Sequence, residues 1–197
     1  MKECIGGVIL YDETIRQKTS SGKTITDLIN SHGAVAGIKV DTGAKTLAGS
    51  SEEKVTEGLD GLRERLLEYF DLGARFAKWR AVININESIP SPGCLLANTH
   101  ALARYARLCQ ENGLVPIVEP EVLMDGGHSA KECFIKTSEV IKRCFEELIL
   151  HKVDLKGVIL KPNMILSGNK SKEKISNEEV ATLTLDCLKE SVPSEVP

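Results

Sequence analysis

Charged side chains stand at the ends of four hydrophobic segments of this chain. They are Lys39 with Asp41, Lys78 with Arg80, Glu119 with Glu121, and Lys161 directly before Pro162. Residues i and i+2 of a β-strand project from the same face of a sheet. One such pair is ordinary at a solvated strand end. Four strand ends in register indicate a functional site, because parallel barrels place catalytic groups at the carboxyl ends of their strands. Spacing alone leaves the reaction open.

Short segments rich in β-branched residues must position these charges. They recur at residues 5–10, 35–40, 74–82, 114–118 and 157–160. The residues between the paired charges, Val40, Trp79 and Pro120, are expected to face the surrounding helices, since neighbouring residues of a strand point to opposite faces.

Amphipathic helical patterns fill the gaps between these segments. One apolar face consists of Leu59, Leu62, Leu66 and Phe70, and a second of Ala101, Leu102, Tyr105 and Leu108. Gly113 is placed to end the second helix. Ser129 with Glu132, and Ser176 with Glu179, match the capping box that begins a helix. Strands separated by helices of this length predict right-handed βαβ units and a parallel sheet.

Five βα units are visible, whereas a closed (β/α)8 barrel needs eight strands and about 250 residues. The chain is therefore predicted to be an α/β protein with either an open doubly wound sheet or an incomplete barrel of five parallel strands. No linker or low-complexity tract interrupts it, so residues 1–197 are expected to form a single domain.

Composition narrows the possible partners. The net charge of −3 and the scattered Lys and Arg residues argue against a nucleic-acid surface. No apolar run approaches the roughly 20 residues that span a bilayer, and no signal peptide is expected, because a strand-like segment directly follows residues 1–4. The six cysteines are widely spaced without a C-x-x-C motif, so reduced thiols in the cytoplasm are expected, with neither disulfides nor a zinc site.

Three local motifs carry little weight. Gly22-Lys23-Thr24 resembles the end of a phosphate loop, but position 17, where that motif begins with glycine, is Gln17. His128 has no paired metal ligand in its neighbourhood of sequence and is interpreted as a loop histidine. The sequon that begins at Asn169 has no meaning in a cytoplasmic protein.

Seven segments resemble successive landmarks of class I fructose-bisphosphate aldolases, in the same order and with similar spacing. They are IGGVIL (5–10), GIKVD (37–41), EGLDGL (57–62), FAKWR (76–80), LARYA (102–106), VPIVEPE (115–121) and LKPNM (160–164). The resemblance implies the TIM (β/α)8-barrel fold. It also implies reversible cleavage of fructose 1,6-bisphosphate to dihydroxyacetone phosphate and glyceraldehyde 3-phosphate in glycolysis. Gly127 departs from the family, which more often has an acidic residue there.

The resemblance also assigns roles to the charged strand ends. Lys161 matches the lysine that forms an imine with the ketose. Glu119 matches the glutamate that moves protons during carbinolamine formation and dehydration, and Lys78 matches the lysine that assists beside it. The remaining charged residues match groups that support the site or lie near the sugar phosphate: Lys39, Asp41, Arg80 and Glu121.

The residue types agree with this chemistry. An amine attacks a carbonyl only when it is unprotonated, and both a neighbouring cation and a dry environment disfavour the charged form. The protonated imine then withdraws electrons from the bond that breaks, so neither a metal nor another cofactor is expected. A phosphorylated sugar is the expected partner, and the family is usually homo-oligomeric.

The resemblance covers the central part of the family's barrel. It leaves out the first strand, with the aspartate that drives carbon–carbon cleavage, and the last two strands, with a phosphate-binding loop and arginine. The alternative is therefore a catalytically incomplete fragment that acts, if at all, as a binding or assembly module. Another lysine-dependent barrel enzyme, such as a transaldolase, has little support because the landmarks match the aldolases.

Overall fold

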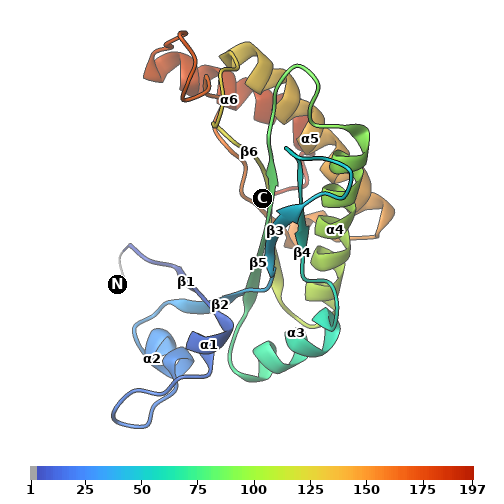
Figure 1. Cartoon of the computed structure of the whole chain (residues 1–197). Coiled ribbons are helices and arrows are strands. Elements are labelled where there is room, and N and C mark those ends of the chain that lie inside the picture. The colour runs from blue at the N-terminus through green and yellow to red at the C-terminus, as the bar shows by residue number, and fades with distance from the viewer. Residues whose placement is uncertain (1–3) are drawn as a thin grey trace.

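A computed structural model describes residues 4–197 and contains a five-stranded parallel sheet (Figure 1). In spatial order its strands are β1 (Gly7–Leu10), β2 (Val35–Lys39), β5 (Phe76–Ile83), β6 (Val115–Val122) and β7 (Ile159–Leu160). All four neighbouring pairs are parallel. The prediction of five parallel strands at these places in the chain is confirmed, and the sheet is open, with β1 and β7 at its edges.

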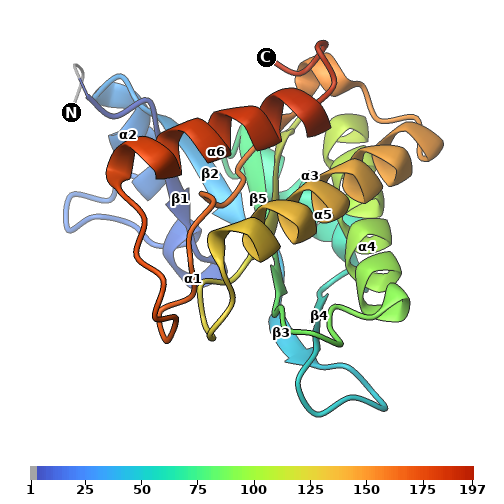
Figure 2. The same cartoon turned by 90° about the horizontal axis from the view of Figure 1, so that it is seen from above.

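Six α-helices and one 3-10 turn accompany the strands within the described residues. They are α1 (Asp12–Ile15), α2 (Ile25–Ser31), α3 (Leu62–Asp71), α4 (Pro92–Glu111), α5 (Ala130–Leu150), η1 (Leu155–Gly157) and α6 (Asn177–Ser191). Helices α3, α4 and α5 lie along one side of the sheet, and α6 runs beside α5 (Figures 1 and 2). Both predicted capping boxes, at the starts of α5 and α6, are present.

Strand β5 shows how the sequence separates two faces of the sheet. Its side chains alternate strictly between buried and half-buried positions. The buried Trp79 packs against Tyr105 of α4, with ring centroids 5.5 Å apart, so its face is the one that the helices cover. Lys78 and Arg80 therefore project from the other face, as the spacing predicted.

A glycine allows close packing of β1, β2 and β5 on the face of the sheet from which Lys78 projects. The ring of Phe76 lies directly over Gly37, in the space that a Cβ would occupy. Any other residue at position 37 would collide with this ring, and Gly7 stands close to the same ring. This contact explains the glycine that begins the GIKVD segment.

An antiparallel hairpin between β2 and α3 was not predicted from the sequence. It consists of β3 (Gly43–Thr46) and β4 (Lys54–Glu57) and packs against β5 and α4. The side chain of Asn98 in α4 accepts a hydrogen bond of 3.1 Å from the Thr56 amide and donates one of 2.8 Å to the Lys54 carbonyl. The strands are four residues long and largely polar, so they lack the apolar pattern of the central strands. The short helices α1 and α2, of four and seven residues, were also not predicted. None of the described helices is long and apolar enough to cross a membrane.

Candidate active site

A buried glutamate joins the two lysines at the centre of the candidate site. Lys161 Nζ donates a hydrogen bond of 2.5 Å to Glu119 Oε1, and Lys78 Nζ lies 2.8 Å from Glu119 Oε2. The second contact is an ion pair whose angles depart from those of a hydrogen bond. The Glu119 side chain is only 2% exposed, so the carboxylate depends on these two ammonium groups for compensation.

Backbone pairing sets the distance between these three residues. Glu119 lies in β6 and Lys78 in β5, the neighbouring strand. Lys161 directly follows β7, and its amide donates to the Val118 carbonyl at 2.9 Å. The lysine side chains therefore approach the carboxylate from the strands on either side. Lys161 is 56% exposed, whereas Lys78 is 19% exposed.

A second buried carboxylate, Asp41, stands just after the end of β2. Its Oδ1 accepts a hydrogen bond of 2.5 Å from Lys39 Nζ and one of 3.1 Å from the Gly43 amide. Its Oδ2 accepts a bond of 3.4 Å from the Arg80 amide, which connects the end of β2 to β5. The Asp41 side chain is 3% exposed, so these bonds hold Lys39 in a defined place at the strand end.

Arg80 and Glu121 form the third ion pair of the predicted set. The guanidinium donates to the Glu121 carboxylate from the neighbouring strand. This hydrogen bond raises the pKa of Arg80, against the opposing effect of desolvation. Both side chains are partly exposed, at 42% and 26%, so Arg80 is accessible to a ligand from solution.

The structure thus places all seven predicted residues in or just after four neighbouring strands, in three groups of ion pairs. The expectation that the charged pair Lys78 and Arg80 ends its strand is wrong, because β5 continues through Ala81 to Ile83. Four of the seven are cationic and three are anionic, which leaves one net positive charge suited to a phosphorylated ligand. Lys161 and Glu121 also line a small cavity of about 210 Å³ together with Asn163. An amine that touches a buried carboxylate beside this cavity can attack a carbonyl and exchange protons with its neighbour.

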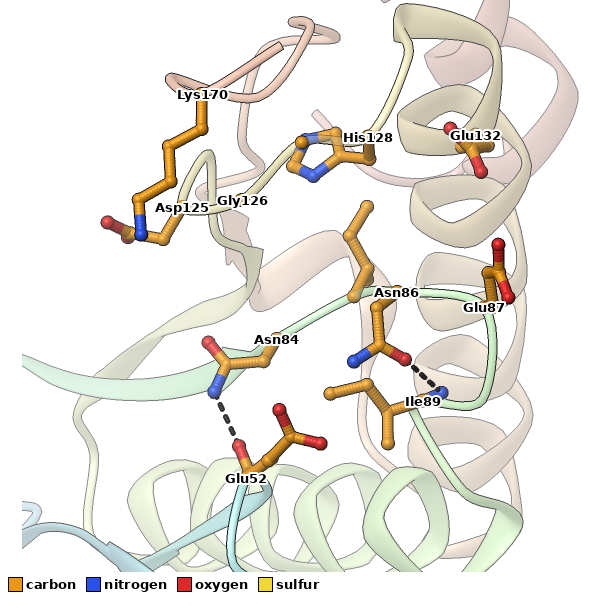
Figure 3. Close-up of a pocket in the computed structure, with 12 residues that line it drawn as sticks. Glu52, Asn84, Asn86, Glu87, Ile89, Asp125, Gly126, His128, Glu132 and Lys170 are labelled. Carbon is orange, nitrogen blue, oxygen red and sulfur yellow. Dashed lines mark hydrogen bonds between the residues drawn. The ribbon is translucent and has the colours of Figure 1, made fainter.

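A larger pocket of about 480 Å³ lies beyond the ends of β5 and β6 (Figure 3). Figure 3 shows Asn84 donating to the Glu52 carbonyl, across from the loop that carries Asp125 and His128. Neither Asn84 nor Glu52 was predicted from the sequence to belong to a site. Asn84 directly follows β5, which was an available signal. No sequence signal pointed to Glu52, because it lies between the two strands of the hairpin that was not predicted.

His128 lies in the loop before α5, as predicted, but it is 6% exposed and therefore buried. Within the described residues its ring nitrogens have no hydrogen-bond partner of good geometry. Burial lowers the pKa of His128, although the nearby Glu132 carboxylate and the Leu166 backbone oppose this effect. The backbone of Gly126 lies so close to Gly168 that a side chain at position 168 would collide with it. The buried His128 ring therefore forms part of the wall of the pocket.

The whole chain, residues 1–197, matches the family model of fructose-bisphosphate aldolase class-I. The chain belongs to this family. It is 56% identical over 197 residues to a probable fructose-bisphosphate aldolase class 1 of Xanthomonas axonopodis pv. citri. It is 47% identical over 196 residues to fructose-bisphosphate aldolase C of Carassius auratus. Its fold matches that of Plasmodium falciparum fructose-bisphosphate aldolase, solved in complex with TRAP and a small-molecule inhibitor, with a TM-score of 0.95 and 42% identity.

The aldolase relatives are longer than this chain. The alignment covers all of the chain but 59% of the Xanthomonas protein and 54% of the Carassius protein. It covers 98% of the chain and 56% of the Plasmodium chain. The five-stranded sheet is therefore part of the aldolase TIM-barrel fold, as the sequence predicted.

Proposed function

We propose that this chain carries the imine-forming half of a class I fructose-bisphosphate aldolase site, with Lys161 as the nucleophile. The amine would attack the ketose carbonyl, and loss of water would give an iminium ion that weakens the adjacent carbon–carbon bond. The observation that supports this proposal best is the contact between Lys161 and the buried Glu119. A hydrogen-bonded carboxylate can take the amine proton and later deliver a proton to the departing hydroxyl.

Lys78 is proposed to assist from the other side of the same carboxylate. Its ammonium lies 2.8 Å from Glu119 Oε2, so it compensates the buried negative charge while Glu119 exchanges protons with the substrate. A second cation near Lys161 also favours the uncharged amine that the attack requires.

Lys39 and Arg80 are proposed to bind or orient a substrate phosphate. Both are held by carboxylates at neighbouring strand ends, Lys39 by Asp41 and Arg80 by Glu121, and both remain partly exposed. A guanidinium fixed in this way can meet phosphate oxygens with two parallel hydrogen bonds. The names of the relatives support a fructose bisphosphate as substrate, and two Arabidopsis relatives named cytosolic support a cytoplasmic location.

Reductive trapping tests the proposal directly. The chain is incubated with dihydroxyacetone phosphate, reduced with borohydride, digested and mapped by mass spectrometry. The expected result is a single adduct on Lys161, which is lost in Lys161→Arg and retained in the matched surface variant Lys189→Arg. An adduct on Lys78 in its place, or no adduct in a sample whose circular dichroism shows a folded chain, would contradict the assignment.

A further inference from the structure

Two histidines and a glutamate meet in the helical layer, away from the lysine site. His100 comes from α4, while Glu147 comes from α5 and His151 directly follows it. Each offers one potential ligand atom, and these atoms lie within 4.8 Å of one another. Among the described residues this is the one group of three or more His, Cys, Asp or Glu side chains with such geometry.

The distances suit a small tetrahedral cation. His100 Nδ1 lies 3.2 Å from Glu147 Oε2, and His151 Nδ1 lies 3.7 Å from the same oxygen. In a tetrahedral zinc site with bonds of about 2.0–2.1 Å, neighbouring ligand atoms are about 3.3 Å apart. Small side-chain movements would therefore bring all three atoms into bonding range. The two imidazole rings already stand edge to face, with centroids 4.7 Å apart.

Burial and neighbouring hydrogen bonds hold the carboxylate in place. The Glu147 side chain is 6% exposed, which is unusual for a glutamate and calls for a compensating charge. Arg143 donates to Glu147 Oε1 at 3.4 Å and leaves Oε2 directed at the histidines. A hydrogen bond to the carboxylate oxygen that does not bind the metal fixes the orientation of the ligand.

The histidines leave room for a fourth ligand. Their side chains are 45% exposed at His100 and 22% exposed at His151, so a water molecule can reach the cluster. His151 Nδ1 now donates to the Glu147 carbonyl at 2.8 Å, and metal binding would replace that proton. Two imidazoles and one carboxylate form a donor set that suits Zn²⁺ and its neighbours in the first transition series better than Mg²⁺ or Ca²⁺.

We propose that His100, Glu147 and His151 bind a zinc-class transition-metal ion that connects α4 to α5. The site lies in the layer that covers the Trp79 face of the sheet, and Lys78 projects from the opposite face. The metal is therefore structural and takes no part in imine chemistry. By joining two helices it would raise thermal stability without changing the reaction of Lys161.

Cobalt binding provides the test, because tetrahedral Co²⁺ absorbs strongly in the visible region. The experiment uses the untagged chain with Cys4→Ser, since Cys4 is an exposed free thiol that would also bind metal. The expected result is a tetrahedral Co²⁺ spectrum that added Zn²⁺ removes. His100→Ala and Glu147→Gln should each raise the dissociation constant at least about tenfold. His32→Ala, which changes an exposed histidine after α2, should leave it unchanged.

Thermal unfolding provides a second measurement that does not depend on the spectrum. Zn²⁺ should raise the melting temperature of the Cys4→Ser chain and of its His32→Ala variant, but not that of His100→Ala. His100 is half exposed, so its replacement should preserve the fold, and circular dichroism checks this. The absence of a tetrahedral spectrum, or a cobalt affinity of His100→Ala and Glu147→Gln equal to that of the Cys4→Ser chain, would overturn the proposal. Neither result bears on imine formation at Lys161.

Discussion

Lys161 donates a hydrogen bond of 2.5 Å to Glu119 although 42 residues separate them in the chain. The parallel register pairs Leu160 of β7 with Val118 of β6, so the next residue of each strand stands at the same level of the sheet. The amine and the carboxylate are therefore brought together by backbone pairing and need no flexible loop to meet.

Replacement of the carboxylate should slow imine formation. Glu119→Gln retains the side-chain shape but removes the group that exchanges protons with the amine and the carbinolamine. The rate of borohydride-dependent labelling at Lys161 should fall by about 100-fold or more. The matched change Glu64→Gln, on the exposed face of α3, should leave it unchanged. Labelling of Glu119→Gln at the rate of the unmodified chain would exclude the proposed role.

Chelators should not affect the reaction at Lys161. The iminium ion supplies the electron sink, and the proposed metal site lies in the helical layer, so EDTA should lower neither labelling nor any cleavage. The measurement is labelling of Lys161 before and after dialysis against EDTA, with His100→Ala as the matched control. Loss of labelling with recovery on adding zinc would indicate metal-dependent chemistry.

The 197-residue polypeptide should self-associate and cleave fructose 1,6-bisphosphate poorly. Its sheet has unpaired edges at β1 and β7, where Ile9 is 41% exposed and Ile159 is 47% exposed. Lys161 itself is 56% exposed, so water has ready access to the imine. Light scattering should show oligomers, and a coupled assay should show negligible turnover. A monodisperse monomer with turnover like that of the full-length relatives would refute this expectation.

Glu53 should make stability depend on pH. Burial alone would raise its pKa, but hydrogen bonds from the Ser91 amide at 2.6 Å and the Ser91 hydroxyl at 2.9 Å outweigh that effect, so the pKa is lowered. A carboxyl whose pKa is lower in the folded state stabilises the fold above its unfolded pKa of about 4.3, and this contribution is lost as the pH falls through the folded value.

Glu53→Gln should therefore lower the free energy of unfolding by about 1–3 kcal/mol at pH 7, with a smaller deficit in acid. Urea unfolding at a series of pH values measures this difference. The neighbouring exposed residue provides the control, and Glu52→Gln should have little effect at any pH. An equal deficit for Glu53→Gln at pH 7 and in acid would show that the ionised carboxylate is not responsible.

Much of the fold and the charged residues of the site could be predicted from the sequence. The five strands have apolar patterns, four of which carry charged residues, and period-two alternation alone assigned Lys78 and Trp79 to opposite faces. The capping boxes at Ser129 and Ser176 rest on contacts three residues apart, so the sequence shows them directly. The aldolase resemblance then identified which charged residues belong together.

Only the tertiary structure decided the contacts between distant segments. The sequence did not reveal that Glu52 reaches the pocket beyond β5, because a hairpin with short polar strands carries it there. It also did not reveal that His100 meets Glu147, because the angle and spacing at which α4 packs on α5 set their separation. Local patterns depend on a few neighbouring residues, whereas these contacts depend on how whole elements pack, and side-chain volumes across the core determine that packing.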